Sequence, residues 1–281
     1  MKCMTGEIRA MERGDIGEVR ALTESEDWGF DESDFTRILD IFPGGSFVAE
    51  EGGEIIGVVT TSSYASTGWI GTVIVDSCHR TRGIGKALVE RGILHIEDGG
   101  LRSTLLYSYD GLEDFYRAFG FRSLDRYVAY RGIIRATSRK TRAEVLETED
   151  MPDLLRLDRY SFGDDRSELL ARMRSEFPEA CHVLKSQEEI IGYSMAQISD
   201  RLTNVGPAIC IGPRCEALML ESVGLLLEGR EVFLATKKGK NETLMRQIGL
   251  EPSFEVTRMV RGQEPEGNPE TVLAICGLEK G

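Results

Sequence analysis

Apolar and polar residues follow one another along the first half of the chain in a pattern that predicts strands and helices in mixed order. Short, β-rich apolar runs predict strands over residues 7–11, 46–51, 54–63, 69–75, 105–109 and about 121–132. Apolar residues at helical spacing predict helices after residue 15 and over 33–42, 83–97 and 112–119. This order is typical of an α/β (α+β) fold with a mixed, mostly antiparallel sheet flanked by helices.

The second half of the chain repeats the pattern of the first. The hairpin pattern of Ser46–Gly57 returns in Cys181–Gly192, and both segments end in Ile-Ile-Gly. Tyr116–Phe121 likewise matches Met245–Leu250. A repeat this long indicates a duplicated domain, because solenoid repeats have periods of about 20–50 residues. We therefore expect two domains, at residues 1–137 and 138–281.

The charge balance narrows the classes of partner. The formal net charge of −13 argues against nucleic acid, whose binding needs a basic stripe. An acidic chain is compatible with a cationic amine substrate, although the same balance also serves solubility. No apolar run reaches the length of about 18 residues that a transmembrane helix needs, so we expect no membrane partner.

The cysteines and the first residues favour a cytoplasmic protein without a metal. The six cysteines are scattered and form no C-x-x-C pair: Cys3, Cys78, Cys181, Cys210, Cys215 and Cys276. A metal site or a disulfide framework is therefore not expected. The N-terminal residues have no apolar signal core.

Residues 76–86 contain the strongest chemical signal. The apolar run Trp69–Val75 ends at Asp76, a polar loop follows, and Gly83 and Gly85 begin a helical pattern. The first amides of a helix lack intrahelical partners, and the helix dipole favours negative charge there. The segment is thus a candidate anion site, although the closing Gly-Lys-Ser/Thr of a P-loop is missing.

The spacing Arg80-x-x-Gly83-x-Gly85 resembles the pyrophosphate-binding motif of the GNAT acetyltransferase superfamily, R/Q-x-x-G-x-G/A. An ordinary strand-to-helix turn that contains glycine and arginine is the alternative interpretation. A second motif favours the family. The string Phe115-Tyr116-x-x-x-Gly120-Phe121 looks like the GNAT signature F/L-Y-x-x-x-G-F, although Tyr116 would also suit a helix core.

The resemblance implies acetyl-CoA as cosubstrate and names the residues that would bind it. The backbone of Val73, Ile74 and Val75 would hold the pantetheine arm. The loop would hold the pyrophosphate through Arg80, Thr81, Arg82, Gly83, Ile84, Gly85 and Lys86. Tyr116 would lie near the thioester and act as general acid toward the departing sulfur, and Phe115 and Phe119 would also bind the cofactor.

The general base and the acceptor site are less defined. Many GNAT enzymes carry a glutamate on the strand at 69–75, but this strand has none. Asp31, Asp34, Asp76 and a water chain are the candidates, although each carboxylate taken alone better suits a helix cap or a solvated position. We expect Trp28 and Phe30 to line the acceptor site together with Asp31 and Asp34, because aromatic rings beside carboxylates suit a cationic amine.

The second copy lacks this chemistry. It has no R-x-x-G-x-G, Pro213 stands where free amides would be needed, and Met245 takes the place of Tyr116. The arrangement resembles the YitH-type tandem GNAT proteins, in which a diverged second domain contains a Gly-Pro segment, here Gly206-Pro207. We expect the second domain to be a degenerate GNAT-like copy that shapes the acceptor pocket or only stabilises the first.

The sequence therefore predicts an N-acetyltransferase (an acyltransferase) that acts on a primary amine of a small molecule or an amino acid. A donor with a longer acyl chain is one alternative, and a non-catalytic CoA- or metabolite-binding sensor is another. The sequence leaves the oligomeric state open, a homodimer included.

Overall fold

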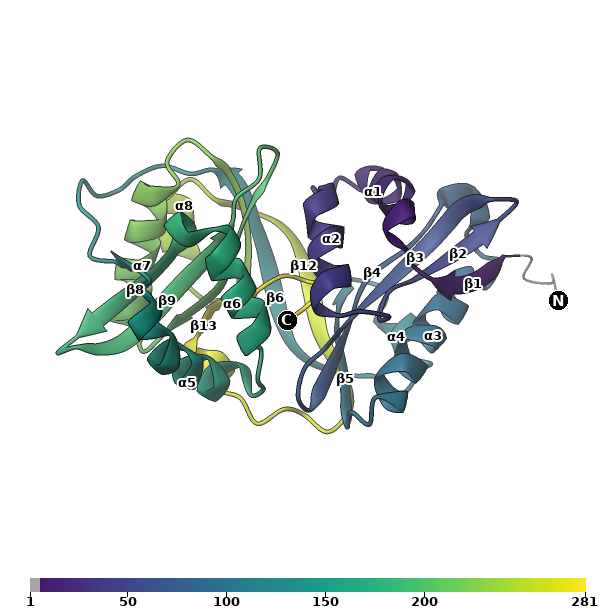
Figure 1. The fold of residues 1–281 in the computed structure, drawn as a ribbon. Coiled ribbons are helices and arrows are strands. Elements are labelled where there is room, and N and C mark those ends of the chain that lie inside the picture. Colours follow the sequence, from purple (N-terminus) through teal and green to yellow (C-terminus); the bar gives the residue numbers. More distant parts are fainter. Residues whose placement is uncertain (1–5) are drawn as a thin grey trace.

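The computed structural model describes residues 6–281 of the chain, and one sheet runs through this whole part. The sheet has 13 strands in the order β1-β2-β3-β4-β5-β12-β6-β11-β10-β9-β8-β7, and β13 pairs with β10 off this path. Helices cover both faces of the sheet (Figure 1). This architecture confirms the predicted α/β class with a mixed, mostly antiparallel sheet.

The first half follows the predicted order of elements, with bounds that differ from the prediction by two residues at most. They are β1 (Glu7–Ala10), α1 (Ile16–Glu24), α2 (Glu32–Ile41), β2 (Phe47–Glu51), β3 (Glu54–Ser63), β4 (Thr67–Val75), α3 (Ile84–Asp98), β5 (Ser103–Tyr109), α4 (Glu113–Arg117) and β6 (Arg122–Ile133).

The second half repeats this order, as the sequence comparison of the two halves predicts. Its elements are β7 (Glu144–Val145), α5 (Met151–Phe162), α6 (Ser167–Glu176), β8 (Cys181–Ser186), β9 (Glu189–Gln197), β10 (Thr203–Cys210), α7 (Pro213–Leu226), β11 (Glu231–Lys237), α8 (Glu242–Gln247), β12 (Glu251–Gly262) and β13 (Val272–Ala274).

Apolar side chains point alternately to the two faces of the first-half sheet, so both faces are buried. Val48 and Val58 point toward α1 and α2, where they join an apolar cluster with Phe35. The neighbouring positions Phe47 and Val59 point to the other face and pack against α3. A period of two along each strand thus separates two cores, and α3 is fixed on the face opposite α1 and α2.

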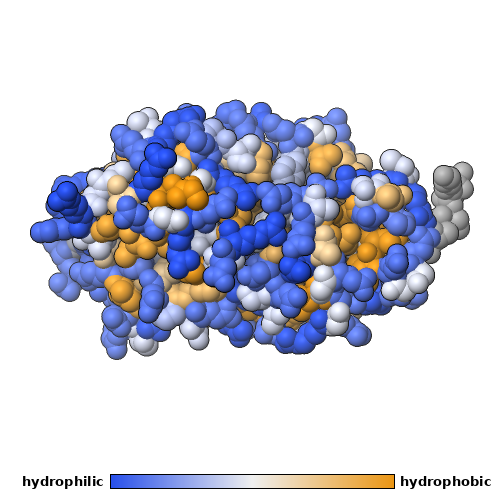
Figure 2. Space-filling view, turned by 90° about the horizontal axis from the view of Figure 1, so that it is seen from above, coloured by the Kyte–Doolittle hydropathy of each residue, from blue (hydrophilic) through white to orange (hydrophobic). Residues whose placement is uncertain are grey.

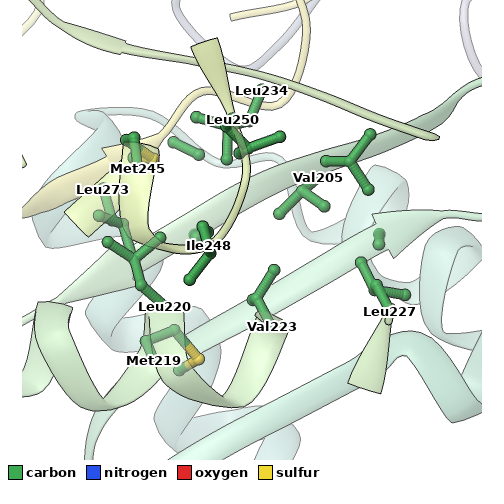
Figure 3. Close-up of a cluster of buried hydrophobic side chains, with 14 of the residues drawn as sticks. Val205, Met219, Leu220, Val223, Leu227, Leu234, Met245, Ile248, Leu250 and Leu273 are labelled. Carbon is green, nitrogen blue, oxygen red and sulfur yellow. The ribbon is translucent and has the colours of Figure 1, made fainter. Parts of the chain in front are cut away.

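The second half has an analogous pair of cores. One cluster lies under α5 and α6, and the other lies between the sheet and α7. Figure 3 shows Leu220 and Val223 of α7 in the second of these clusters, with Leu227 just after the helix and Met245 and Ile248 from the region of α8. Met245 is fully buried, so the residue at the position of Tyr116 here belongs to an apolar core.

The two halves exchange their long strands β6 and β12. β12, from the second half, lies antiparallel to β5 of the first, from Val256 opposite Tyr109 to Gly262 opposite Ser103. β6, from the first half, pairs with β12 between Arg122 and Arg131 and with β11 from Tyr127 to Ile133. Each half therefore completes its sheet with a strand that the other half supplies.

Figure 2 views the molecule from above and shows hydrophilic residues over most of that face, with separate apolar patches between them. Among residues 6–281, no helix is both long enough and apolar enough to cross a membrane.

Because the two halves exchange the strands β6 and β12, we predict that they unfold together. Met259 of β12 is fully buried in the first-half core, so we expect Met259→Ala to lower the free energy of unfolding by about 2–5 kcal/mol. Calorimetry should show one transition that moves as a whole. Ile133→Ala, at an exposed position of β6, is the matched control and should move it little. Two transitions, of which Met259→Ala displaces one, would contradict the prediction.

Candidate functional site

The sheet of the first half opens between β4 and β5. These parallel strands pair only from Thr67 opposite Ser103 to Trp69 opposite Leu105. Beyond this point β4 carries a bulge, where its register with β3 shifts and Thr72 has a φ of 48°. The edge of β4 that faces β5 is consequently unpaired over residues 73–75. Buried backbone groups need partners, and an extended ligand lying along this edge would supply them.

The loop after β4 is held by its own side chains. Asp76 Oδ1 accepts a hydrogen bond from the amide of Cys78 at 2.9 Å and lies 2.8 Å from His79 Nδ1. The hydrogen bond to His79 lowers the pKa of the Asp76 carboxyl. Arg80 Nε donates to the carbonyl of Val75 at 3.0 Å. Asp76 and Arg80 therefore fold the loop back onto the end of β4, and Asp76 has a structural task.

The start of α3 presents unpaired amides. Gly83 precedes the helix with a φ of 89°, and Thr81 also has a left-handed conformation. The first helical hydrogen bond runs from the amide of Ala87 to the carbonyl of Gly83 at 3.0 Å. In the described part of the chain, the amides of residues 83–86 donate to no backbone acceptor. They form a positive helix terminus of the kind that binds phosphate groups.

The space above these amides is open. A Cβ added at Gly83 would meet no atom within 4 Å, and one at Gly85 would meet only Val75 Cγ2 at 3.6 Å. Neither glycine is therefore required by packing against its neighbours. Gly83 is required by its left-handed backbone, and the absence of both side chains leaves room for a ligand against the backbone.

Carboxylates from other segments pair with the loop cations. Arg82 donates two hydrogen bonds to Glu51, at 2.8 and 2.9 Å, and Arg80 pairs with Glu26. Lys86 lies 3.6 Å from Glu90 one helical turn later. The loop pattern does not predict Glu26 or Glu51, because they come from the α1–α2 region and the β2–β3 hairpin. A phosphate at this site would compete with them for the arginines.

Tyr116 lies in α4, at the far side of the opening. Its side chain is buried, with the rings of Phe115 and Phe121 edge-on at 5.0 and 6.2 Å between centroids. Burial raises the pKa of Tyr116 to about 12, and the neighbouring Tyr109 adds to the effect. The phenol is neutral at ordinary pH and available as a hydrogen-bond donor. Phe119, also predicted for the site, packs on Phe115.

The exchanged strand β12 fixes both ends of α4. Thr257 donates to Glu113 in the first turn of the helix at 3.1 Å. Arg261 Nε donates to the carbonyl of Phe119, just after the helix, at 3.0 Å. Residues of the second half thus hold the helix that carries Tyr116, a contribution that no local motif of either half reveals.

A row of aromatic rings joins the predicted acceptor residues to the end of β5. Trp28 stacks on Tyr109 with centroids 6.3 Å apart and planes at 15°, and Phe30 lies edge-on to Trp28 at 6.4 Å. Tyr109 in turn contacts Phe254 of β12 at 5.0 Å. The loop before α2 therefore does lie beside the opening of the sheet, next to the strand that leads to α4.

Asp31 and Asp34 form the capping box of α2. Asp31 Oδ1 accepts hydrogen bonds from the amides of Ser33 at 2.8 Å and Asp34 at 3.1 Å, and Asp34 accepts from the amide of Asp31 at 2.9 Å. Burial works against ionisation of Asp31, but the bonds from Ser33 and the amides outweigh it and lower its pKa. Burial raises the pKa of Asp34. Of the two, Asp34 is the better proton acceptor.

Asp34 also connects the halves. It accepts a hydrogen bond from Arg37 at 3.0 Å, and the buried Arg37 extends to Glu176 at 2.6 Å and Gln197 at 3.1 Å in the second half. The start of α2 is therefore anchored against the second half as well as capped.

In the second half, the equivalent opening is filled by the chain itself. β10 pairs with β11 only at Thr203 and Asn204, as β4 does with β5. β13 then pairs with β10 at Ala208 and Ile209, on the edge that remains free in β4. The helix after β10 begins with Pro213, which has no amide hydrogen to offer.

Among residues 6–281, no group of three or more His, Cys, Asp or Glu side chains is arranged to hold a metal ion.

Comparison with known proteins gives a match in each half. A model described as acetyltransferase (GNAT) family matches residues 17–121, and one described as acetyltransferase (GNAT) domain matches residues 154–274. The chain is 28% identical over 163 residues to the uncharacterized N-acetyltransferase YitH of Bacillus subtilis. That match covers 56% of this chain and 56% of YitH, so the chain spans about half the length of this relative.

Solved structures share the fold over the whole chain. A proposed acetyltransferase from Pyrococcus horikoshii superposes with a TM-score of 0.82 at 20% identity, over 100% of this chain and 98% of the other. A tandem GNAT protein from the clavulanic acid biosynthesis pathway does so with a TM-score of 0.60 at 15% identity, over 92% and 99%.

The raised pKa of Tyr116 predicts an alkaline loss of stability. Below pH about 10 the phenol is neutral in the folded and unfolded chain, so stability there is unaffected. Above that pH the unfolded tyrosine releases its proton while the folded one keeps it up to about 12, so stability falls as pH rises.

When the pH rises from 9 to 11, the free energy of unfolding should fall by about 1.4 kcal/mol less in Tyr116→Phe than in the wild type. Urea denaturation at the two pH values measures this difference. Tyr160→Phe, at an exposed tyrosine, is the control. An equal loss in Tyr116→Phe and wild type would show that the phenol is not held neutral in the fold.

Proposed function

Because the chain belongs to the GNAT family of acetyltransferases, with one such domain in each half, we propose that its first half transfers the acetyl group of acetyl-CoA to a primary amine. The observation that carries the proposal is the continuity of two ligand-binding features. The open edge of β4 at residues 73–75 runs directly into the loop and the unpaired amides of residues 83–86.

Acetyl-CoA suits these two features. Its pantetheine arm is an extended chain with amide groups, which the edge of β4 can hydrogen-bond as it would a neighbouring strand. Its pyrophosphate is the kind of anion that a helix N-terminus with glycines binds. In this proposal Val73–Val75 hold the arm, Gly83–Lys86 hold the pyrophosphate, and Arg80 and Arg82 exchange their carboxylate partners for phosphate oxygens.

The proposed reaction is direct attack of the amine on the thioester carbonyl. A nitrogen–carbon bond forms, the carbon–sulfur bond breaks, and the thiolate leaves with the electron pair. A lysine-type amine with a pKa of about 10.4 costs about 4–5 kcal/mol to deprotonate at pH 7. We assign this proton to Asp34, whose pKa burial raises. The second proton, which the nitrogen loses as the amide forms, passes to solvent.

Tyr116 acts on the leaving sulfur. A free thiol has a pKa of about 8.5, well below the value of about 12 for Tyr116. Because the pKa of the phenol is the higher of the two, a strong hydrogen bond from the phenol to the developing thiolate is favoured over complete proton transfer. The proton that completes free CoA then comes from solvent.

The second half, in this proposal, binds no CoA and serves the first half. Two observations support this role: β13 occupies the edge that an arm would need, and β12 holds both ends of α4.

We predict one acetyl-CoA per chain in isothermal titration calorimetry. The double variant Gly83→Glu/Gly85→Glu places two carboxylates at the anion site and strains the left-handed Gly83, so affinity should fall roughly 100-fold or more. Gly212→Glu, at the equivalent open and left-handed glycine of the second half, is the matched control and should bind normally. Two sites per chain, or unchanged binding in the double variant, would overturn the assignment.

We predict that Tyr116→Phe lowers kcat about 10²-fold in an amine-acetylation assay, because the leaving sulfur loses its donor. The dissociation constant of acetyl-CoA should stay within about 2-fold, since the ring and its packing remain. An unchanged kcat would remove Tyr116 from the chemistry, and a matching loss of acetyl-CoA binding would make its role structural.

A further inference from the structure

The segment of residues 275–281 crosses from the second half to the first. On the side of the second half, Asn204 donates to the carbonyl of Cys276 at 3.1 Å. On the side of the first half, the hydroxyl of Tyr64 donates to the carbonyl of Lys280 at 2.7 Å. Figure 1 shows the end of this segment in the middle of the molecule, between the two halves.

The segment lies directly on β4 where the sheet opens. A Cβ placed on Gly71 would be 2.3 Å from the Cα of Glu279, so only glycine permits this contact. Gly71 is two residues beyond Trp69, the last residue of β4 that pairs with β5, and it precedes the bulge at Thr72. Glu279 therefore lies beside the end of the proposed pantetheine site.

This contact places a buried primary amine at the same point. The side chain of Lys280 is only 6% exposed, and its ammonium pairs with the carboxylate of Glu279. Asp34 also attracts the Lys280 ammonium. Burial opposes the charge of Lys280, but the carboxylates of Glu279 and Asp34 outweigh burial and raise the pKa of Lys280. The pocket thus holds an alkylammonium ion.

The two carboxylates are held independently of Lys280. The capping box and Arg37 fix Asp34, and the contact of the Glu279 backbone with Gly71 fixes Glu279. If the lysine side chain left the pocket, the buried carboxylate of Glu279 would remain without its cation, which is costly unless another cation enters. Asp34 would keep Arg37 but lose the attraction of the lysine. A substrate amine has the same head group as lysine and fits that need.

We propose that the pocket now filled by the Lys280 ammonium is the acceptor-amine subsite, with Glu279 and Asp34 as the carboxylates that hold the substrate's ammonium, and that substrate must displace Lys280 to enter. This inference rests on the proposed acetyl transfer and adds to it a substrate class, a primary alkylammonium, and a contribution of the second half to the site.

The test replaces the lysine by a free amine. In Lys280→Ala, n-propylamine restores the atoms that the substitution removes. We expect it to raise the Tm of this variant by about 2–4 °C in a concentration-dependent way. n-Propanol, which lacks the charge, should not do so, and the wild type should respond little to either. Adding Glu279→Gln to Lys280→Ala should abolish the effect of the amine.

The second readout is acetylation. With acetyl-CoA, Lys280→Ala should acetylate n-propylamine with a KM at least about 10-fold below that of the wild type, because no internal amine competes. Lys280→Arg keeps the charge and binds carboxylates through two donors, so it should raise KM instead. This variant preserves the ion pair and keeps the test valid if Lys280→Ala does not fold.

Each outcome decides the proposal. An equal response of Lys280→Ala to n-propylamine and n-propanol would overturn it. Stabilisation by the amine without its acetylation, in a protein that binds acetyl-CoA, would also overturn it, because the pocket would not be the acceptor subsite. An unchanged KM in Lys280→Arg would likewise overturn the proposal. Failure to bind acetyl-CoA at all would overturn the proposed function, while the thermal shift would still report on the amine pocket.

Discussion

The antiparallel pairing of β12 with β5 and β6 is the interaction on which the rest of the molecule depends. Through it, the last long strand of each half completes the sheet of the other, and the backbone hydrogen bonds of one sheet run across both domains. The pairing also delivers Thr257 and Arg261 to the two ends of α4 and Phe254 to the aromatic row beside Tyr109. The candidate site of the first half is therefore built on a strand of the second.

A second constraint acts in both halves, because each sheet opens between two parallel strands and leaves a free backbone edge. Unpaired backbone groups in a protein interior need partners, so such an edge must receive a ligand, water or another strand. In the second half β13 pairs with this edge at Ala208 and Ile209. In the first half residues 73–75 remain available. The two copies therefore differ at this edge, which is unpaired over residues 73–75 in the first half and paired with β13 in the second.

Much of the fold could be predicted from the sequence, because local patterns determine it. The hairpins, the helix from Ile84 and the repeated order of elements all follow from apolar spacing. The exchange of β6 and β12 could not be predicted. The two strands resemble each other in sequence, as in Tyr127–Gly132 and Thr257–Gly262, so the alternation of side chains is the same whichever half each strand joins. Only tertiary packing distinguishes the two arrangements.

In the candidate site, too, local motifs predict some features and long-range contacts determine the others. The glycines of the loop and the position of Tyr116 are encoded in short motifs. Trp28 stacks on Tyr109 at the end of β5, and Phe30 lies edge-on to Trp28, while their role toward an acceptor stays a prediction. The partners of the charged residues are long-range contacts that no motif encodes, such as Glu51 for Arg82.

Gly71 carries the one local signal for the 275–281 segment. A glycine inside a buried strand weakens the strand unless another backbone must approach it closely. Here the approaching backbone is that of Glu279, more than 200 positions later in the chain. The strand that lacks an acidic side chain of its own thereby gains a carboxylate from the other half. The second half, which has no R-x-x-G-x-G motif of its own, therefore supplies a residue where the sheet of the first half opens.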